Sequence, residues 1–338
     1  MDSAFNSFVV GDRSMLSYIK REIHNLVLES GFSPHRAAET DIVLAELTSN
    51  LIKFAGSGEL LFRRIDRDEV PGIELYCMDN GPGIENIAKM FADGYSTSNT
   101  LGHGLGAVKR LSDTFEIYSI KGRGTVQHAR IFEKSREIAP ERKKGFTCAA
   151  VMTNYPGETV CGDGYFVKPL GNGLLAMVGD GLGHGAYANE AVQAALQAFR
   201  YTRLTDPAEI IREIHMQVKR TRGLVCTVAH LDKKAGVWSL CGVGNIATRI
   251  YLGLENKTYT PYNGIIGHNI PRTMNNTLHP FSKDQMLVMC SDGIRTKWKL
   301  SEYPALLKEK PGLIAAAIYK ENWRGTDDAT VLVSKFND

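Results

Sequence analysis

Four acidic positions in the second half of the sequence combine a carboxylate with an adjacent apolar run. They are Asp163-Gly164, Asp180-Gly181, Asp292-Gly293 and Asp327-Asp328. At the second of them, the apolar run of residues 173–178 predicts a buried strand, and small residues follow the carboxylate at its end. Backbone without a Cβ atom lets a metal ion approach closely, so Asp180 and the Gly181 carbonyl are candidate oxygen ligands. An ordinary strand–turn–helix corner, where Asp-Gly is common, is the alternative for this stretch taken alone.

The first half carries a different set of polar side chains. Glu46 and Asn50 are four residues apart on a predicted helix, so they lie on neighbouring parts of one face. A solvated helix face is the commoner role of such a pair. Asp79 ends a predicted strand and enters a loop that contains Gly81 and Gly83. The pattern therefore presents one carboxylate beside flexible backbone.

A glycine-rich segment, Gly102-His103-Gly104-Leu105-Gly106, opens a short predicted helix over residues 107–111. Glycines at a helix start allow backbone N–H groups to face an anion, and the helix dipole adds to the attraction. The spacing alone is a weak signal. The segment neither follows a Rossmann-type strand nor ends in the Lys-Ser/Thr of a P-loop, so both of those nucleotide sites are excluded.

The elements that must position these residues follow from the apolar spacing. In the first half, a helix is predicted over residues 13–30, and a second begins at Ser33-Pro34, which supply an N-cap and a first-turn proline. We expect the second helix to bury Ala38, Ile42, Ala45, Ser49 and Ile52. Strands are predicted at residues 59–65 and 72–78, and a hairpin at residues 115–120 and 125–132.

The second half is predicted to consist mostly of strands, among them residues 146–153, 173–178, 224–231, 236–241 and 285–290. Helices are predicted over residues 186–200 and 206–222, the second with Asp206 as its N-cap. A terminal helical region is predicted over residues 301–323. The fold class that follows is α+β.

Length and composition bound the organisation. At 338 residues two domains are expected, and the charged segment of residues 135–145 predicts a linker between domains at 1–134 and 146–338. A net charge of +3 argues against a nucleic-acid partner. No apolar run approaches membrane-spanning length, and the six cysteines form no C-x-x-C pair. We therefore expect no membrane partner and a cytoplasmic protein with buried thiols.

The order of signals in the first half resembles the GHKL ATPases, the superfamily of histidine-kinase, gyrase and Hsp90-type ATP domains. Five features occur in the order found in that superfamily. They are an Asn-bearing helix, an Asp-x-Gly-x-Gly loop, a small-residue segment at residues 93–99, a Gly-rich helix start and Gly124-Thr125. The likeness covers residues 1–134 and is greatest to the RsbT-like anti-sigma-factor serine kinases. It implies a Bergerat-type α/β sandwich. Because no phospho-acceptor His helix precedes the Asn box, a sensor histidine kinase is excluded.

This resemblance implies roles for the polar set. Asn50 would bind Mg²⁺ on the phosphates of ATP, and Glu46 would take the proton from an attacking serine. Asp79 would accept a hydrogen bond from the adenine amino group. The supporting set would be Gly81, Gly83, Gly102, Gly104, Gly106 and Thr125. Phosphoryl transfer mainly requires positioning and charge neutralisation, which Mg²⁺ and helix-start N–H groups supply.

The second half resembles the PPM-type metal-dependent protein phosphatases, in their SpoIIE-like branch and especially the RsbX-like class. The likeness covers about residues 147–335 and rests on the four acidic stations in order, with Gly181-x-Gly183-His184-Gly185 after the second. It implies an αββα sandwich with bound Mg²⁺ or Mn²⁺. No arginine that could grip phosphate is evident near Asp163.

This resemblance implies that the aspartates at the four acidic positions are metal ligands. Asp180 would bridge two ions, Asp163 and Asp292 would each bind one, and Asp327, rather than its neighbour, would complete the cluster with the Gly181 carbonyl. A water shared by the ions would be the nucleophile. His184 would be either an acid for the leaving serine or a loop residue bonded to backbone.

Together the two resemblances imply a bifunctional switch that phosphorylates and dephosphorylates serine or threonine on STAS-domain regulatory proteins of a sigma-factor or stressosome-like pathway. ATP, Mg²⁺ and Mn²⁺ would be its cofactors, and a homodimer is compatible with the sequence. In the alternative, only the phosphatase is catalytic and the first half is a nucleotide- and partner-binding regulatory module. A purely structural interaction protein is a third interpretation, in which the aspartates are incidental.

Overall fold

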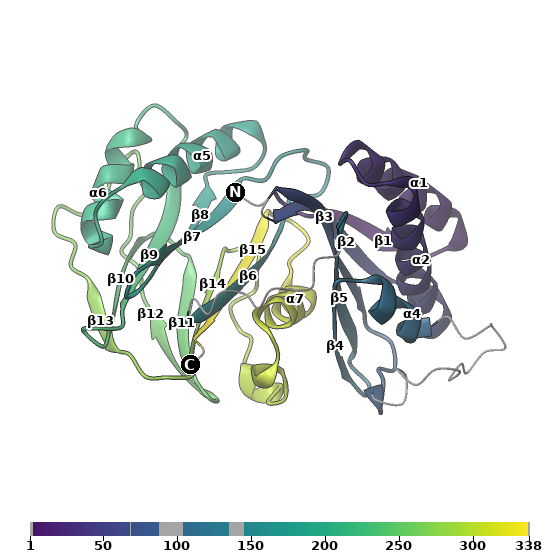
Figure 1. Cartoon of the computed structure of the whole chain (residues 1–338). Coiled ribbons are helices and arrows are strands. Elements are labelled where there is room, and N and C mark those ends of the chain that lie inside the picture. Colours follow the sequence, from purple (N-terminus) through teal and green to yellow (C-terminus); the bar gives the residue numbers. More distant parts are fainter. Residues whose placement is uncertain (1–2, 68, 88–103, 135–144, 337–338) are drawn as a thin grey trace. The chain divides into compact units, whose positions relative to one another are not determined.

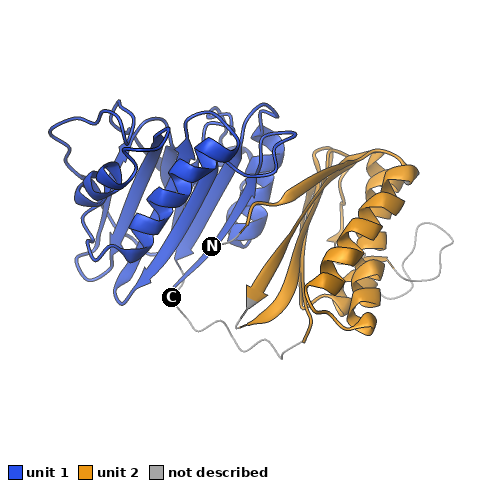
Figure 2. Cartoon of the chain, turned by 90° about the horizontal axis from the view of Figure 1, so that it is seen from above, with its two compact units in different colours: residues 1, 143–338 blue, residues 2–142 orange. Residues whose placement is uncertain are grey.

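The computed structural model describes residues 3–67, 69–87, 104–134 and 145–336. The chain divides into two compact units, Asp2–Arg142 and Lys143–Asp338 with Met1, which are called the N-terminal and C-terminal units below (Figure 2). Within the described residues, no helix is both long and apolar enough to cross a membrane. The six cysteines are thiols and form no disulfides, and all but the half-buried Cys148 are buried, as expected for thiols inside strands.

The N-terminal unit is a five-stranded antiparallel sheet with helices packed on one face (Figure 1). In sheet order, the strands are β1 (Asn6–Val10), β2 (Gly58–Arg67), β3 (Val70–Asp79), β5 (Gly124–Phe132) and β4 (Thr114–Ile120). The helices are α1 (Arg13–Glu29), α2 (Pro34–Asn50), the π-helical turn η1 (Leu51–Ala55) and α4 (Gly104–Leu111). Their apolar sides share one core with β2, β3 and β5.

Local signals place the boundaries of the first two helices. Asp12 caps α1 by accepting the N–H groups of Ser14 and Met15, and Ser33 caps α2 by accepting that of Arg36. The predicted hairpin is confirmed as β4 and β5. Strand β1, which pairs with β2, was not predicted, because its five residues carry little alternation.

The predicted buried face of α2 was wrong, although Ile52, just beyond the helix in η1, does pack against the core. The residues that pack into the core are Ala37, Thr40, Val43, Leu44, Leu47 and Thr48, whereas Ile42 is 44% exposed. Apolar residues lie all round this helix, so two stripes have the helical period. The stripe that contains Val43, Leu44 and Leu47 buries more apolar surface and therefore faces the sheet.

The C-terminal unit is a sandwich of two five-stranded sheets covered by helices. One sheet consists of β13 (Thr277–Pro280), β10 (Val237–Val243), β9 (Leu224–Asp232), β8 (Gly173–Gly181) and β7 (Asp163–Leu170). The other consists of β12 (Glu255–Tyr259), β11 (Ala247–Leu252), β14 (Gln285–Cys290), β15 (Ala329–Phe336) and β6 (Phe146–Thr153). Helices α5 (Ala186–Tyr201) and α6 (Pro207–Gln217) cover the first sheet, and α7 (Pro311–Asn322) covers the second (Figure 1).

The core of this unit lies in two layers. One buried cluster joins the facing sheets, with Leu174, Ala176 and Val178 of β8 opposite Leu287 and Leu332 of the second sheet. A second cluster joins the other face of β8 to α5 and α6. Both faces of β8 are therefore buried, which explains why residues 173–178 are a continuous apolar run rather than an alternating one. The observed layers confirm the α+β class and the αββα sandwich.

The predicted terminal helical region over residues 301–323 is present, but it is interrupted rather than one helix. The structure has two 3₁₀ turns, Leu300–Glu302 and Leu306–Lys308, before α7 begins at Pro311. Proline lacks an N–H group and is compatible with the first turn of a helix but not with its interior. Pro304 and Pro311 therefore divide the segment.

Candidate functional site

The acidic stations Asp163 and Asp180 lie side by side at one end of the first sheet. Strands β7 and β8 pair antiparallel with Asp163 directly opposite Asp180. The Gly181 N–H donates to the carbonyl of Gly162 at 3.0 Å, which continues the pairing past the strand end. An added Cβ at Gly181 would lie 2.4 Å from the Ala188 carbonyl, so glycine is required where α5 approaches this backbone.

Asp292 and Asp327 are brought to the same region by the second sheet. Cys290 at the end of β14 pairs with Val331 near the start of β15, so Asp292 and Asp327 lie at the same end of these two neighbouring strands. The Ser291 N–H donates to the Thr330 carbonyl at 3.1 Å and continues the ladder. The structure therefore brings together four aspartates, each at the end of a different strand, although they span 165 positions of the chain.

Ser291 connects the two sheets at this point. Its Oγ donates to Asp163 Oδ2 at 2.6 Å and accepts the Thr330 N–H at 2.9 Å. The other carboxylate oxygen of Asp163, Oδ1, is buried and has no hydrogen-bond partner among the described residues. A buried carboxylate oxygen without a partner is costly, and a bound cation is the usual remedy.

Burial, reinforced by mutual repulsion, raises the pKa values of the carboxylates in this cluster. Burial and the neighbouring carboxylates Asp163, Asp292, Asp327 and Asp328 raise the pKa of Asp180 to about 10. Burial, opposed by the Ser291 hydroxyl but reinforced by Asp328 and Asp292, raises the pKa of Asp163 to about 8. Burial and Asp292 also raise the pKa of Asp327. The four predicted stations are thus close enough to interact strongly, with no compensating cation in the set.

The cluster fits divalent ions that retain water ligands. Among the described residues, no three His, Cys, Asp or Glu side chains converge tightly enough to hold one ion alone. Mg²⁺ takes only oxygen ligands, usually one or two carboxylates, and keeps several waters. The donor set of carboxylates plus the Gly181 carbonyl, with an unpartnered oxygen on Asp163, suits such ions and not zinc.

A second ring of polar residues borders the cluster. His184 Nδ1 lies 2.7 Å from Glu158 Oε1, and its ring stacks on Tyr155 at a centroid distance of 4.2 Å. The Tyr155 N–H donates to Asp328 Oδ1 at 2.8 Å, so Asp328 has a backbone partner. Of the two alternatives for His184, the one bonded to backbone is not what the structure shows, because its partner is a carboxylate.

Two more residues at the rim were not predicted as site residues. Asn245 Nδ2 donates to Asp292 Oδ2 at 2.9 Å. Arg222 Nη1 donates to the Leu182 carbonyl at 3.4 Å, beside the loop that follows Gly181. Asn245 follows a Gly-x-Gly segment in the sequence, which is a signal for a turn near a site, but its pairing with Asp292 depends on long-range packing.

In the N-terminal unit, Asp79 and Thr125 face each other across β3 and β5. Thr125 Oγ1 lies 2.9 Å from Ser119 Oγ, which also accepts the Ile84 N–H at 2.7 Å. An added Cβ at Gly124 would lie 1.9 Å from the Asp79 carbonyl, so only glycine fits there. Ser119, which was not predicted, therefore links the loop after β3 to the hairpin.

The loop after Asp79 also contacts the end of the Asn-bearing helix. Asp79 Oδ1 accepts the Gly81 N–H at 2.8 Å, and an added Cβ on Gly81 would lie 2.7 Å from the Ala55 Cβ. Ala55 ends η1, the π-helical turn that begins directly after Asn50. Such turns are frequent at functional sites because they reorient side chains within a helix.

The other predicted residues are less closely tied to Asp79. Gly83 has a positive φ of 71° and lies against the Ile120 carbonyl. Glu46 and Asn50 are half-buried on the last turns of α2. Gly104 and Gly106 lie at the start of α4, whereas Gly102 and the segment of residues 93–99 fall outside the described residues.

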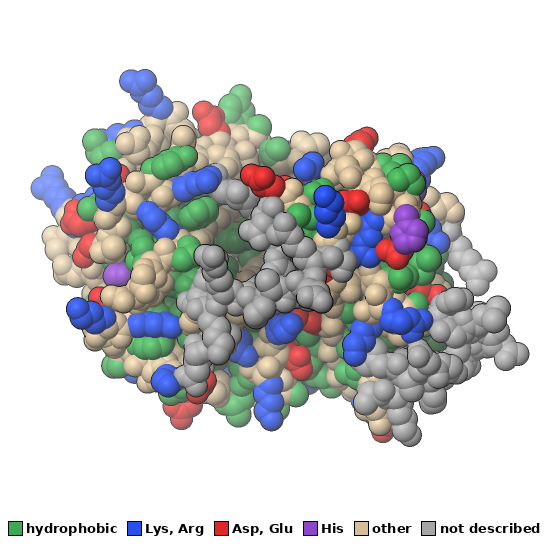
Figure 3. All heavy atoms as spheres, viewed as in Figure 1, with side chains coloured by type: hydrophobic (Ala, Val, Ile, Leu, Met, Phe, Trp, Pro, Cys, Tyr) green, Lys and Arg blue, Asp and Glu red, His purple; other side chains and the backbone are tan. Residues whose placement is uncertain are grey.

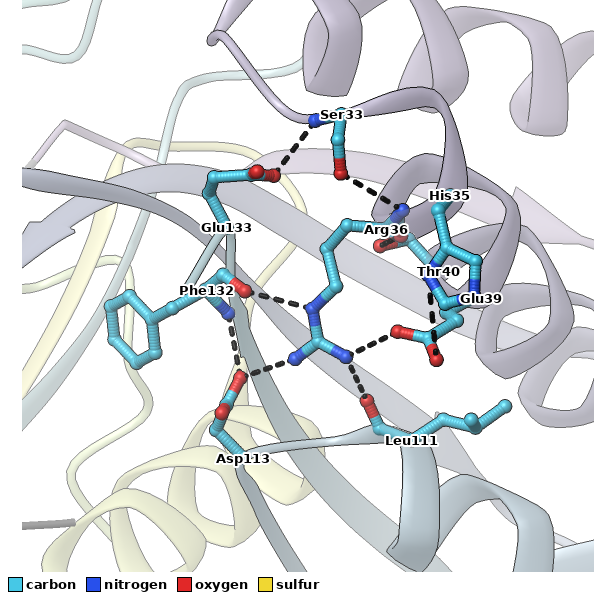
Figure 4. Close-up of polar contacts among 9 residues, drawn as sticks. All are labelled: Ser33, His35, Arg36, Glu39, Thr40, Leu111, Asp113, Phe132 and Glu133. Atoms are coloured by element: carbon cyan, nitrogen blue, oxygen red, sulfur yellow. Dashed lines mark hydrogen bonds and ion pairs between the residues drawn. The ribbon is translucent and has the colours of Figure 1, made fainter. Parts of the chain in front are cut away.

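A half-buried arginine, Arg36, fixes α2 relative to α4 and the sheet (Figure 4). The Arg36 guanidinium donates to Glu39, to Asp113 and to the carbonyls of Leu111 and Phe132, at distances of 2.6 to 3.0 Å. Leu111 ends α4 and Phe132 ends β5, so one side chain joins three elements. This cluster sets the relative position of the helices that carry Asn50 and Gly104.

Comparison with known proteins agrees with this division. Residues 37–135 match the model of the histidine kinase-, DNA gyrase B- and HSP90-like ATPases, and residues 171–337 match that of stage II sporulation protein E. Over 101 residues the chain is 38% identical to the serine/threonine-protein kinase RsbT of Bacillus subtilis (strain 168). The aligned segment covers 30% of this chain and 76% of RsbT. Over 158 residues the chain is 25% identical to the phosphoserine phosphatase RsbX of the same organism, which covers 46% of this chain and 79% of RsbX.

Two solved structures share the fold of the C-terminal unit. One, described as "The bacterial stressosome: a modular system that has been adapted to control secondary messenger signaling", is 26% identical with a TM-score of 0.53, over 56% of this chain and 98% of the other. RsbX in complex with magnesium is 21% identical with a TM-score of 0.50, over 57% of this chain and 96% of the other.

Fold, site and comparisons together define a class: a GHKL-type ATPase domain joined to a PPM-type phosphatase domain. Partner-switching signalling is the role that this combination supports. Within the class, the chain belongs to the family of RsbT-like serine/threonine-protein kinases through its first half, and that half is fused to an RsbX- and SpoIIE-like phosphatase domain.

Proposed function

We propose that the C-terminal unit hydrolyses phosphoserine or phosphothreonine on a regulatory protein, with Mg²⁺ or Mn²⁺ bound at the acidic cluster. The observation that carries the proposal is the convergence of four aspartates from four strand ends, with a buried oxygen of Asp163 left without a partner. Asp163, Asp180, Asp292, Asp327 and the Gly181 carbonyl are the proposed ligands. The magnesium bound to the related RsbX supports this choice of ion.

The residues of the chain have distinct parts in that chemistry. When bound, the ions supply charge neutralisation and an acidified water as nucleophile. Burial and the neighbouring carboxylates raise the pKa of Asp180, so a bound cation would favour its charged, metal-binding form. His184, held by Glu158, lies at the rim where a leaving serine oxygen needs a proton.

The N-terminal unit is proposed to bind ATP and Mg²⁺ and to phosphorylate the same class of protein. Asp79, Gly81, Gly83 and Thr125 would form the adenine end of the site, since the structure places them around one loop and hairpin. Glu46 would be the base and Asn50 the Mg²⁺ ligand. STAS-domain proteins are the proposed substrates. Because both activities together would hydrolyse ATP in a futile cycle, we propose that one unit is silenced while the other acts.

The alternative is that only the phosphatase is catalytic and the N-terminal unit is a regulatory module that binds nucleotide and partner. Purified full-length protein and its Glu46→Ala and Asp180→Asn variants, incubated with STAS-domain candidates, ATP and Mn²⁺, would separate these functions by the mass of the partner. Accumulation of phosphoserine with Asp180→Asn, and none with Glu46→Ala, supports the bifunctional switch. Phosphate removal by wild type from candidates supplied in phosphorylated form, without any phosphorylation of unmodified candidates by Asp180→Asn, supports the alternative.

A further inference from the structure

Two short segments border the acidic cluster and carry only basic charges. Residues 293–299 directly follow Asp292, and residues 322–326 directly precede Asp327. Neither segment contains an acidic residue, and together they hold four cations: Arg295, Lys297, Lys299 and Arg324. We call these two segments the basic ribbon.

Backbone hydrogen bonds make the basic ribbon one structural element. Ile294 forms an antiparallel bridge with Trp323. The Arg295 N–H donates to the Asn322 carbonyl, and the Arg324 N–H donates to the Gly293 carbonyl, both at 2.9 Å. Residues that alternate along paired strands point to opposite faces. Arg295 and Arg324 therefore share the face opposite to that of Ile294 and Trp323.

The inner face of the ribbon is anchored. Ile294 is fully buried, and the Trp323 ring stacks on Tyr319 of α7 at a centroid distance of 5.4 Å. Arg249 of β11 donates to the carbonyls of Thr296 and Trp298, and its guanidinium lies 4.2 Å from the centroid of the Trp298 ring. The four cations are thus displayed from backbone whose position is fixed next to the metal stations.

The outer face of the ribbon is unpaired. All four basic residues are exposed, and none of them forms an ion pair with any carboxylate in the part of the chain that the structure describes. On the face drawn in Figure 3, Lys and Arg side chains are interspersed with Asp and Glu side chains, in keeping with the small net charge. A group of one sign at the edge of an acidic site is therefore a local feature, not a consequence of overall composition.

We propose that the basic ribbon docks an acidic segment of the phosphoprotein substrate, next to its phosphorylated serine or threonine. This inference rests on the proposed phosphatase activity and adds the substrate's chemistry to it. Charge complementarity carries the assignment, because exposed cations at the rim of a site attract an oppositely charged partner and fix its orientation. It also supplies the anion recognition that the sequence lacks near Asp163, since arginine pairs well with carboxylates and phosphates.

The experiment compares two labelled phosphoserine peptides that differ only in their flanks, Asp/Glu-rich in one and Asn/Gln-rich in the other. Binding is measured by fluorescence anisotropy, and Mn²⁺-dependent phosphate release is measured on both peptides and on p-nitrophenyl phosphate. Wild type is expected to bind the acidic peptide at least five-fold more tightly than the neutral one. The preference should weaken with added salt, since screening lengths fall from about 10 Å at 0.1 M to about 3 Å at 1 M.

The test variant is Arg295→Glu/Arg324→Glu. The matched control is Lys234→Glu/Lys257→Glu, which changes the net charge equally; Lys234 lies in the turn after β9, at the opposite end of the sheet from Gly181. The test variant should lose the preference for the acidic peptide, and its kcat/KM on that peptide should fall about ten-fold relative to p-nitrophenyl phosphate. The control should retain the preference.

Three results would overturn the docking proposal: equal binding of both peptides by wild type, an undiminished preference in the test variant, or an equal loss in the control. Tighter binding of a labelled single-stranded oligonucleotide than of the acidic peptide would also overturn it, in favour of a nucleic-acid partner. If wild type releases phosphate from no substrate, the proposed phosphatase function fails. The anisotropy comparison still decides the docking proposal in that case.

Discussion

Two regions of this protein bury carboxylates, one among positively charged partners and the other among further carboxylates. In the N-terminal unit, Glu74 of β3 accepts hydrogen bonds from Arg63, Arg130 and His128 at 2.6 to 2.8 Å. In the C-terminal unit, Asp163 and Asp180 face other carboxylates. Burial raises the pKa of Glu74, but Arg130 and Arg63 outweigh it and hold that pKa well below its usual range.

The contrast distinguishes Glu74, whose charge is neutralised by its neighbours and stabilises the fold, from the aspartates of the proposed metal site, whose charges are not. Glu74 is complete within its own unit, because every oxygen has a cationic or imidazole partner. The aspartates of the cluster face one another instead, and the proposed cation would offset their repulsion. Repulsion among buried carboxylates lowers the stability of the folded state. Residues that destabilise the fold in this way are often found at functional sites. The predictions below test this difference, beginning with the largest effect.

Asp180→Asn should abolish the metal-dependent activity and stabilise the metal-free protein. We expect Mn²⁺-dependent hydrolysis of p-nitrophenyl phosphate to fall by more than about 100-fold, since even residues that only orient metal ligands contribute about 10–100-fold. In EDTA the Tm of the C-terminal unit should rise, because a repelled carboxylate has been replaced by a neutral amide. Asp232→Asn, at the end of β9 far from Gly181, is the matched control and should change neither. A fall in Tm with Asp180→Asn would refute the claim that the cluster is strained.

Glu74→Gln should destabilise the N-terminal unit by roughly 3–5 kcal/mol, the range for breaking a buried ion pair, because two arginines lose their counter-charge. Hydrogen exchange of β3 and β5 amides measures the effect in this unit alone. Glu85→Gln is the control, since Glu85 pairs with Lys121 on the surface and such pairs contribute about 0–1 kcal/mol. An effect of Glu74→Gln no larger than that of the control would remove the contrast between the two regions.

Ser291→Ala should weaken the metal site without dismantling the sheet. The hydroxyl is the hydrogen-bond donor to Asp163 and also accepts the Thr330 N–H. We expect Mn²⁺ affinity by calorimetry and phosphatase activity to fall by about 10–100-fold, the usual effect of a residue that orients a ligand. Ser334→Ala on β15, where the hydroxyl lies 2.9 Å from Cys148 Sγ, is the matched control. Equal losses in the two variants would indicate a packing role only.

The difference between Asp163 and Ser291 also shows what sequence could and could not provide. Asp-Gly pairs at the ends of apolar runs identify strand ends that carry carboxylates, because that signal is local. The role of Ser291 depends on which strand of one sheet lies over which strand of the other, and no local pattern encodes this packing. Resemblance to known families pointed to the four aspartates as ligands but gave no role in the site to Asn245, Glu158 or Arg222.

The same limit applies to the fold. Capping residues and prolines fixed the starts of α2 and α6, whereas the buried face of α2 was mispredicted because two apolar stripes share the helical period. The Glu74 cluster was not predicted either. Its partners lie on β2 and β5, and an acidic residue in an apolar strand does not reveal whether it is paired. Long-range register, which sets both charge clusters, is the information that local patterns lack.

The two regions should respond to pH with opposite slopes in metal-free protein. The pKa of Asp163 is raised to about 8 and that of Asp180 to about 10 in the folded state, so between the unfolded pKa of about 3.9 and those values the folded state binds more protons. Stability therefore falls as pH rises through this window. Glu74 has a lowered pKa, so its contribution is fully present above about pH 4.3 and is lost only as pH falls below it.

From pH 5 to pH 9 in EDTA, we expect the Tm of the C-terminal unit to fall by a few degrees and that of the N-terminal unit to stay level with respect to these groups. Hydrogen exchange of β8 and β3 assigns each transition to its unit. Saturating Mn²⁺ should reverse the slope, since metal binding requires deprotonated carboxylates and strengthens as pH rises. Asp180→Asn should flatten the metal-free slope. A slope unchanged by that substitution would mean that the pKa of Asp180 is not raised in the folded protein, and the contrast with Glu74 would then fail.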